Sequence, residues 1–232
     1  GLSAAIRLKQ LGTQEGRDIS VCVLEKGSEV GAHILSGAVI DPIGLNELIP
    51  DWKDKGAPLN TQVSEDRFLY LTKGGGFRLP NFIMPPLMNN HGNYIVSLGN
   101  VCRWLAEQAE AAGVEVYPGF AGTEVLYAED GSVRGVATGD MGIGKDGSRT
   151  DMYEPGIELI GKYTFFAEGV RGSLAKELIA KFALDAESDV PKFGIGIKEL
   201  WEIKPNNHAL GQVTHTMGWP LTSDTGGGSF IY

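Results

Sequence analysis

The first 25 residues show a helical hydrophobic pattern followed by a strand-like one. Small and apolar residues recur at spacings of three and four between Gly1 and Gly12, which predicts an amphipathic helix that ends at Gly12. After a polar turn, the continuous apolar run 19–24 is typical of a buried strand in a parallel sheet. Together they predict the later part of a βαβ unit. The predicted apolar face of the helix consists of Ala4, Ala5, Leu8 and Leu11.

An acidic residue ends the predicted strand. Glu25 lies 24 residues after Gly1, close to the spacing of about 20 that separates the phosphate loop from the ribose-binding acid in dinucleotide-binding units. A carboxylate at this place can accept hydrogen bonds from both hydroxyls of an adenosine ribose. Gly1 would then be the last glycine of that loop, and we expect the first strand to lie upstream of residue 1. The alternative is an ordinary βαβ edge with a solvated Glu25.

The same patterns continue along the rest of the chain. Strands are predicted at 67–72, 93–98, 114–117, 123–127, 133–138, 157–160, 163–167, 193–203, 211–219 and 226–232. Helices are predicted at 42–48 with Asp41 as N-cap, after Asn100 as N-cap up to Gly113, and up to Phe182. The Asp130-Gly131 pair predicts a hairpin. The Gly- and Asp-rich segment 139–156 suits a solvated loop better than a phosphate or calcium site, because Met141 and Ile143 interrupt the ligand pattern.

One apolar stretch does not fit any regular element. Residues 74–88 contain Pro80, Pro85 and Pro86, which exclude a regular helix and a central strand. The apolar side chains of this stretch are Phe77, Leu79, Phe82, Ile83, Met84, Leu87 and Met88. They either lie in the core beneath a loop, or form a surface that meets a membrane or a lipophilic substrate.

Charge, apolar run length and cysteine pattern limit the kinds of partner that this chain can have. The formal net charge is −9, which argues against nucleic acid, whose phosphates favour clusters of Lys and Arg. No apolar run approaches the roughly 20 residues of a membrane span. The two cysteines, Cys22 and Cys102, form no CxxC motif and are expected to be small buried hydrophobes in a reducing compartment.

The order of elements indicates a flavoprotein. A βαβ start is followed by mixed strands and then by a second glycine turn and helix at 168–182. The N-terminus of that helix is expected to offer free N–H groups to an anion. Such an order is typical of a nucleotide-binding domain with an inserted substrate domain. It favours FAD over NAD, because two separated segments contact one long cofactor.

Several blocks resemble the electron transfer flavoprotein–ubiquinone oxidoreductase family. The resemblance covers nearly the whole chain. The blocks that carry it are Gly1–Ala5, Val23–Lys26, Gly31–Gly37, Asp51–Asn60, Pro86–Tyr94, Phe166–Gly169, Gly194–Trp201 and Gly218–Leu221. This resemblance implies an FAD, a [4Fe-4S] cluster, and electron transfer from reduced electron transfer flavoprotein to ubiquinone at a membrane surface.

The resemblance also implies roles for residues. The implied FAD-binding residues are Gly1, Glu25, Lys26, Ser36, Gly37, Val125, Glu168 and Gly169. Gly227 and Gly228 match the glycine pair that borders the quinone, although Gly226 stands where an aromatic residue is expected. The implied membrane contacts are Phe82, Ile83, Met84 and Leu87. No residue is expected to break bonds as an acid or base. The cluster's cysteine quartet is expected outside this chain, which contains no metal site of its own.

The expected fold is mixed α/β. It consists of a Rossmann-like FAD-binding domain of the glutathione-reductase type and an inserted mixed-sheet quinone-binding domain, truncated at both ends. The predicted parts are an FAD domain (1–65), a membrane and quinone segment (66–122), the returning FAD domain (123–185) and part of the quinone domain (186–232). We expect a monomer on the inner membrane, on the bacterial cytoplasmic or mitochondrial matrix face, and a fragment that is inactive by itself. The alternatives are another FAD oxidoreductase of the geranylgeranyl-reductase or hydroxylase group, and a nucleotide-binding protein that transfers nothing.

Overall fold

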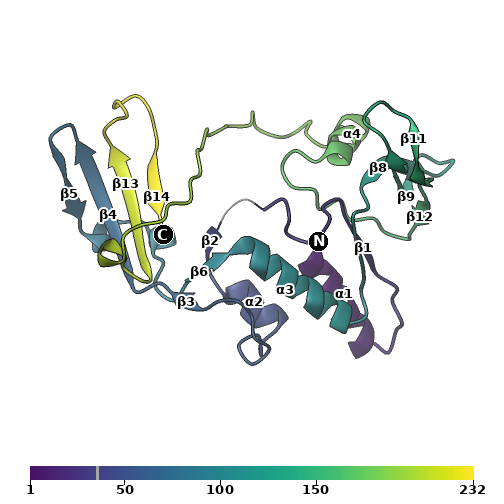
Figure 1. Ribbon diagram of the computed structural model, residues 1–232, viewed down its shortest axis with the longest axis horizontal. Coiled ribbons are helices and arrows are strands. Elements are labelled where there is room, and N and C mark those ends of the chain that lie inside the picture. Colours follow the sequence, from purple (N-terminus) through teal and green to yellow (C-terminus); the bar gives the residue numbers. More distant parts are fainter. Residues whose placement is uncertain (35–36) are drawn as a thin grey trace. The chain divides into compact units, whose positions relative to one another are not determined.

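The computed structural model describes residues 1–34 and 37–232 and has two compact units of mixed α/β structure (Figure 1). Unit 1 comprises residues 1–33 and 105–196, and unit 2 comprises residues 34–104 and 197–232. Each unit therefore combines segments that lie far apart in the sequence. The predicted domain boundaries fall at other positions and stay predictions.

Unit 1 begins with the predicted helix and strand. Helix α1 (Leu2–Gln14) leads to strand β1 (Cys22–Glu25), which pairs in parallel with β7 (Glu115–Pro118). The prediction that Gly12 ends the helix is wrong, because Gly12 is buried inside it. A Cβ at residue 12 would lie 2.9 Å from the carbonyl oxygen of Arg17, so glycine lets the following turn return close to the helix.

The buried face of α1 also differs from the predicted one. The residues of α1 that are buried are Ala5, Ile6 and Gly12. Ala4 and Leu11 are exposed. The buried face is therefore displaced around the helix from the predicted one, and Ala5 is the residue common to both.

A second sheet in unit 1 packs against a helix. Strands β8 (Gly122–Tyr127), β9 (Val133–Thr138) and β12 (Glu158–Ile160) form an antiparallel sheet in the order β12-β9-β8. Helix α4 (Ser173–Phe182) places Leu174 and Leu178 against Val125 in a small core. The predicted hairpin is confirmed, and its turn is closed where the Ser132 N–H donates to Asp130 Oδ1 at 2.9 Å.

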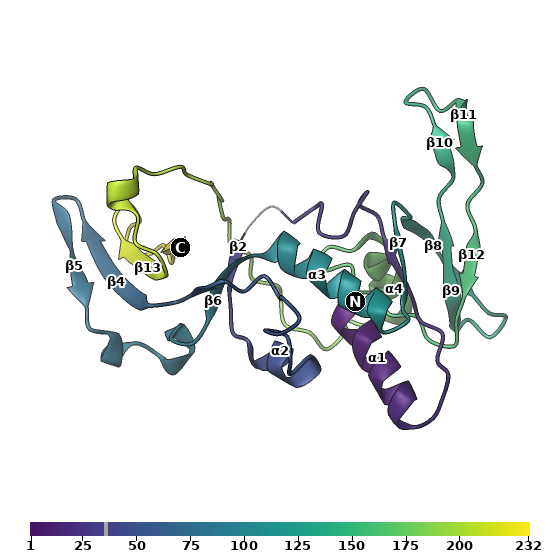
Figure 2. The same ribbon diagram turned by 60° about the horizontal axis from the view of Figure 1, so that its bottom comes forward.

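The segment 139–156 is a hairpin, so the prediction of a solvated loop is wrong. Strands β10 (Met141–Ile143) and β11 (Arg149–Glu154) pair antiparallel and extend beyond β8 and β9 (Figure 2). The Gly144 N–H donates to the carbonyl of Ser148 at 2.8 Å and closes the turn. Met141 and Ile143, which interrupt a calcium pattern, carry the alternation of a strand instead.

The N-terminus of α4 is occupied by a side chain of the chain itself. Glu168 accepts hydrogen bonds from the N–H of Ala175 at 2.8 Å and of Leu174 at 3.4 Å. The expectation of free N–H groups for an anion is therefore wrong for these two donors. A Cβ at Gly172 would lie 2.5 Å from Glu168 Oε2, so a glycine at 172 is needed for this carboxylate to fold back onto the helix.

Unit 2 contains a small sheet with a tryptophan-rich core. Strands β2 (Gly37–Ile40), β6 (Tyr94–Ser97) and β3 (Thr61–Gln62) form an antiparallel sheet beside helix α2 (Ile43–Leu48). Trp52 is buried and meets Tyr94 edge-on at 5.6 Å. Buried Trp104 donates its Nε1–H to the carbonyl of Lys55 at 3.0 Å. These contacts fix the 51–59 segment against β6 and against the helix that follows it.

Helix caps in this region differ in part from prediction. Helix α3 (Leu98–Ala111) begins two residues before the predicted cap Asn100. The Asn100 N–H donates to Ser97 Oγ at 3.5 Å, so Ser97 interacts with the first turn instead. At α2 the N-cap is Pro42, so the prediction of Asp41 as N-cap is wrong by one residue, although Asp41 Oδ1 still accepts the N–H of Ile43 at 3.0 Å.

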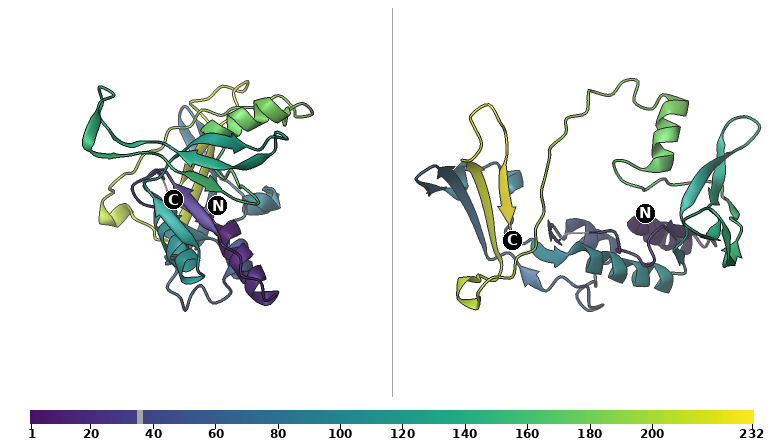
Figure 3. Two further views of the ribbon diagram at one scale, coloured as in Figure 1. Left: turned by 90° about the vertical axis from the view of Figure 1, so that its right-hand side faces the viewer. Right: turned by 45° about the horizontal axis from the view of Figure 1, so that its top comes forward.

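The larger sheet of unit 2 has four strands, in the order β14-β13-β4-β5 (Figure 3, right, yellow beside blue). Its strands are β4 (Glu65–Thr72), β5 (Gly75–Leu79), β13 (Gln212–Gly218) and β14 (Gly228–Ile231). β13 runs parallel to β4, whereas β5 and β14 are antiparallel edges. The first part of the stretch 74–88 forms edge strand β5, a regular element that the sequence did not predict. Its proline-broken remainder forms two 3₁₀ turns, Asn81–Ile83 and Pro86–Met88. A third such turn is Pro205–Asn207.

Three predictions from hydrophobic pattern are wrong. Residues 163–167 and 193–203 form no strand. Side chains of the second segment, such as Ile195 and Leu200, are fully exposed. An alternating or apolar run becomes a strand only when another strand edge pairs with it. Cys22, predicted to be buried, is exposed, and Cys102 is half-buried. Neither forms a disulfide within residues 1–34 and 37–232.

The capping of α4 gives a test of stability. Replacing Glu168 by Ala removes the acceptor of two helix N–H groups and should lower the free energy of unfolding by about 0.5–2 kcal/mol. Glu187→Ala, at an exposed acid beyond the same helix, is the matched control and should change it little. Urea unfolding of the two variants measures the difference. Equal stabilities would contradict the capping role.

Candidate functional site

Glu25 lies at the carboxyl end of β1 and is held by the turn that follows. Its Oε1 accepts the N–H of Gly27 at 2.6 Å, and the side chain is half-buried. The carbonyl of buried Gly27 accepts the N–H of Gly119 at 2.7 Å, after the paired strand β7. The carboxyl group is thus fixed by one oxygen, and Oε2 takes no part in that bond. Lys26 beside it is exposed.

The beginning of α1 lies against the segment that precedes α4. A Cβ at Gly1 would lie 3.6 Å from the Cβ of Ala167, next to Glu168 and Gly169. Gly1 contributes no capping side chain to α1, and the first turn contains no acidic residue. The first N–H groups of this helix therefore meet no negative side chain of their own turn, which suits a phosphate. Two segments predicted to contact one cofactor thus meet.

The other predicted FAD residues differ in their surroundings. Glu168 holds the start of α4, as described above, and Gly169 has a φ of 82°, a conformation that favours glycine. The side chain of Val125 is only 3% exposed in the core of unit 1. Gly37 belongs to unit 2, where its carbonyl accepts the hydroxyl of Tyr232 at 2.8 Å. Ser36 lies outside the described residues.

The predicted quinone-binding glycines lie at the start of β14. Gly228 pairs with Met217 of β13, and a Cβ at residue 228 would collide with the carbonyl oxygen of Thr216. A Cβ at Gly227 would lie 2.8 Å from Leu221 Cδ1, whereas none would meet an atom within 4 Å at Gly226. Gly228 is therefore required by the β13–β14 pairing itself. This requirement does not depend on any ligand.

One face of the large sheet carries a row of rings. Phe68 of β4 stacks on His215 of β13, with ring centroids 4.4 Å apart and planes at 7°. His215 in turn lies 4.7 Å from Phe230 of β14, which lies 5.0 Å from Tyr232. Phe68 is buried, and Phe230 and Tyr232 are exposed. The face is apolar and partly open, which suits a flat ring such as a quinone.

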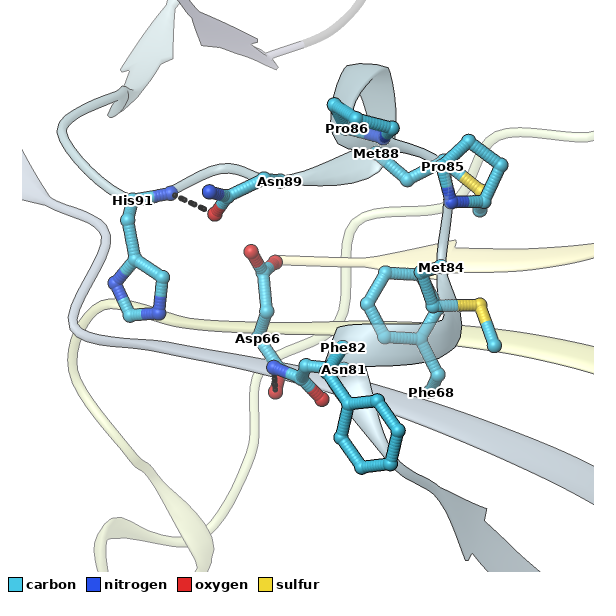
Figure 4. Close-up of a pocket in the computed structure, with 10 residues that line it drawn as sticks. All are labelled: Asp66, Phe68, Asn81, Phe82, Met84, Pro85, Pro86, Met88, Asn89 and His91. Atoms are coloured by element: carbon cyan, nitrogen blue, oxygen red, sulfur yellow. Dashed lines mark hydrogen bonds between the residues drawn. The ribbon is translucent and has the colours of Figure 1, made fainter.

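A pocket of about 360 Å³ lies beside this face, under the proline-broken stretch (Figure 4). It is lined by Asp66, Phe68, Asn81, Phe82, Met84, Pro85, Pro86, Met88, Asn89 and His91. Met84 and Met88 are half-buried. Phe82 and Leu87 are 88% and 99% exposed. Of the four predicted membrane contacts, Phe82, Ile83 and Leu87 are thus exposed, and Met84 faces the pocket.

Sequence reasoning missed Asp66, Asn90 and His215. Asp66 is 1% exposed, and its Oδ2 accepts the backbone N–H of Asn90 at 2.7 Å. Asn90 Nδ2 lies 3.2 Å from His215 Nε2. One signal was available: Asp66 is in phase with Phe68 and Tyr70 in an alternating strand, so an acid occupies an inward position. No sequence signal singles out His215, because its partners come from other strands.

No helix within residues 1–34 and 37–232 is both long and apolar enough to pass through a bilayer.

Comparison with known proteins identifies similar sequences over the whole chain and a family model over its last 40 residues. Residues 193–232, which include β13 and β14, match the family model described as "ETF-QO, ubiquinone-binding". The chain is 62% identical over its entire length to the mitochondrial electron transfer flavoprotein-ubiquinone oxidoreductase of Dictyostelium discoideum, of which it covers 38%. It is 57% identical to the Pseudomonas aeruginosa electron transfer flavoprotein-ubiquinone oxidoreductase, with 100% of this chain and 42% of that protein covered.

A solved structure supports the fold. The geranylgeranyl bacteriochlorophyll reductase-like protein of Thermoplasma acidophilum superposes with a TM-score of 0.52 at 14% identity, over 94% of this chain and 48% of that one. At this identity the likeness concerns the fold alone. The chain spans about two-fifths of the length of the curated relatives that it matches. Over all 232 residues, this chain is therefore similar to electron transfer flavoprotein–ubiquinone oxidoreductases, and its residues 193–232 match their ubiquinone-binding model.

Proposed function

We propose that the protein containing this chain passes electrons from reduced electron transfer flavoprotein, through FAD, to ubiquinone. The observation that carries the proposal is the 62% identity over all 232 residues to a relative with that name. The match of residues 193–232 to a ubiquinone-binding model supports it, because this segment contributes two strands to the apolar face described above. The sites of the two units thus correspond to a flavin side and a quinone side.

FAD is proposed to bind unit 1 in a Rossmann-like domain of the glutathione-reductase type, with the mixed-sheet quinone domain inserted. When bound, FAD supplies the electron-transfer chemistry. Glu25 accepts hydrogen bonds from the ribose, and the start of α1 at Gly1 faces the pyrophosphate. Lys26 completes the proposed set within unit 1. Gly37 belongs to unit 2 and Ser36 lies outside the described residues, so neither is placed in this set.

Glu168 and Val125 are proposed to act indirectly in FAD binding. Glu168 uses its carboxylate to hold α4, so it orients the backbone of Gly169 toward the cofactor. The side chain of Val125 is buried, so its contact with FAD would be through the backbone of β8. β8 is an edge of its sheet, and an edge strand presents unpaired N–H and C=O groups.

Ubiquinone is proposed to lie on the open sheet face beside Gly227 and Gly228. The side chains of Phe82, Ile83 and Leu87 project from the adjoining 3₁₀ turns, and with Met84 they would enter one leaflet of the inner membrane and admit the quinone from lipid. A [4Fe-4S] cluster needs about four cysteine ligands, and this chain has two. Its residues therefore do not fit the cluster, whose ligands we place elsewhere in the protein. The protein is proposed to act as a monomer.

The direct test follows the visible spectrum of the intact natural protein. The bound flavin should bleach when reduced electron transfer flavoprotein is added and recover its colour when a short-chain ubiquinone follows. A flavin that responds to neither would contradict the proposal and leave a different FAD oxidoreductase. A folded protein without flavin would contradict the nucleotide role of Gly1 and Glu25.

Glu25 gives a specific test of the FAD site. Glu25→Gln removes the charge from hydrogen bonds to the ribose, and such bonds contribute about 1.5–3 kcal/mol. We expect FAD to bind about 10- to 100-fold more weakly, measured by titrating the apoprotein with FAD. Glu187→Gln, at an exposed acid of the same unit, serves as the control. Unchanged affinity in Glu25→Gln would show that this carboxylate is merely solvated.

The exposed apolar turns give a test of membrane contact. Phe82→Ala combined with Leu87→Ala removes two large side chains, each of which gains about 1.5–3 kcal/mol on leaving water. Binding to phospholipid vesicles should weaken at least about 100-fold in a flotation assay. Met152→Ala, at an 81% exposed residue of the β10–β11 hairpin, should leave binding unchanged. Equal loss in both variants would argue against a specific contact at 82–87.

A further inference from the structure

A buried carboxyl group organises the centre of unit 2. Asp66 accepts two hydrogen bonds from a single residue, Asn90: the backbone N–H donates to Oδ2 at 2.7 Å and Nδ2 donates to Oδ1 at 2.9 Å. The carbonyl of Asp66 accepts Asn81 Nδ2 at 3.0 Å. Burying a carboxyl group is costly unless such donors satisfy it. Asp66 therefore fixes the position of Asn90 in the turn after the proline-broken stretch.

His215 completes this cluster. Its Nε2 lies 3.2 Å from Asn90 Nδ2 and 3.7 Å from Asp66 Oδ1. Phe68 stacks on one side of the ring and Phe230 tilts against the other. The two rings therefore hold the imidazole in its plane. In the neutral ring Nε2 accepts a hydrogen bond from Asn90 Nδ2, whereas in the imidazolium the Nε2–H is attracted to Asp66 Oδ1. Because Nε2 faces the cluster, Nδ1 lies outside this contact, on another edge of the ring.

The imidazole lies close to the proposed quinone strands. His215 pairs with Phe230, and Met217 pairs with Gly228, two residues along the same ladder. Two residues of a strand span about 7 Å. A quinone ring placed beside Gly228 would thus have its rim next to His215. Its ring side chain has an exposed fraction of 17%, so the site is largely shielded from water.

Reducing a quinone to a quinol takes two electrons and two protons, so an apolar site needs a proton donor. The other ionisable side chains of the face and its covering loop are Asp66, Tyr70, His91 and Tyr232. Histidine is the side chain whose usual pKa lies closest to neutral pH. Of the two histidines, His215 lies between the rings of the sheet face, whereas His91 is exposed in the covering loop. Burial lowers the pKa of His215, and attraction to Asp66 partly opposes this.

We propose that His215 is the proton donor of quinone reduction and that Asp66, acting through Asn90, is the residue that positions its imidazole. This inference rests on the proposed function. As the quinone takes electrons from the reduced flavin, an N–H bond of the imidazolium breaks and an O–H bond to one quinone oxygen forms. The histidine is left neutral and regains a proton from water. The second proton comes from solvent.

The test uses the intact flavin-loaded protein and two electron acceptors. One is a short-chain ubiquinone, and the other is ferricenium, which takes one electron and no proton. In His215→Gln, the rate of flavin reoxidation by ubiquinone should fall about 100-fold or more, the usual range for general acid catalysis. Reoxidation by ferricenium should be unchanged. The dissociation constant of the quinone for the oxidised protein, measured by equilibrium dialysis, should stay within about threefold.

The control and a second variant separate proton donation from structure. His208→Gln, at an exposed histidine of the same unit, should match the wild type in all three measurements. Asp66→Asn removes the attraction that raises the pKa of His215. The quinone step needs the imidazolium, so its rate falls as pH rises through that pKa. In Asp66→Asn the midpoint of this fall should move to lower pH.

Three results would overturn the proposal. The first is a wild-type rate with ubiquinone in His215→Gln. The second is an equal loss with both acceptors, or lost quinone binding, which would mean a structural role for the ring. The third is an unshifted pH midpoint in Asp66→Asn. A wild-type protein whose flavin no quinone oxidises would instead refute the proposed function, and this inference with it.

Discussion

The parallel pairing of β13 with β4 is the interaction on which unit 2 depends. It joins seven residue pairs in register, from Gln212 opposite Glu65 to Gly218 opposite Leu71. Val213, opposite Asp66, is fully buried. Because side chains alternate between faces, a slip of one residue would carry His215 to the other face of the sheet. The row of rings and the contact with Asp66 both require this register.

That pairing also explains why the site lies where the two chain segments meet. β4 and β5 supply Asp66, Phe68 and the edge that leads into the proline-broken stretch, while β13 and β14 supply His215 and Phe230. Neither segment alone forms an apolar face with an ionisable centre. Gly228 also depends on this sheet, since its pairing with β13 leaves no room for a side chain. A glycine at 228, the proposed quinone-binding position, is thus required by the sheet itself.

Local patterns in the sequence predict the elements that depend on local interactions. The α1–β1 order, the hairpin around Asp130-Gly131 and the irregular course after Pro80 are confirmed because periodicity and turn residues specify them directly. The expected strand at 193–203 is wrong, since no pattern along a single segment reveals whether a partner edge exists. Gly12 is misjudged for a similar reason: its role depends on the returning turn at Arg17, which lies outside the helix pattern.

The candidate site residues also differ in whether the local sequence can predict them. Glu25 can be predicted as a candidate ribose-binding residue from its place at a strand end and its spacing from Gly1. The structure places its carboxyl group at that strand end. Glu168 has the expected position, but its carboxylate binds α4, which only the fold of the glycine turn reveals. Asp66 and His215 are 149 positions apart in sequence and meet through strand pairing. Local sequence reasoning therefore cannot bring them together.

The sheet face formed by β4, β13 and β14 is the place where we propose that the quinone lies. Photolabelling the intact protein with an azido-ubiquinone, followed by peptide mapping, tests this most directly. The account predicts that the label falls within residues 66–70 or 212–232 and that unlabelled ubiquinone displaces it. A displaceable label confined to unit 1 would contradict the account.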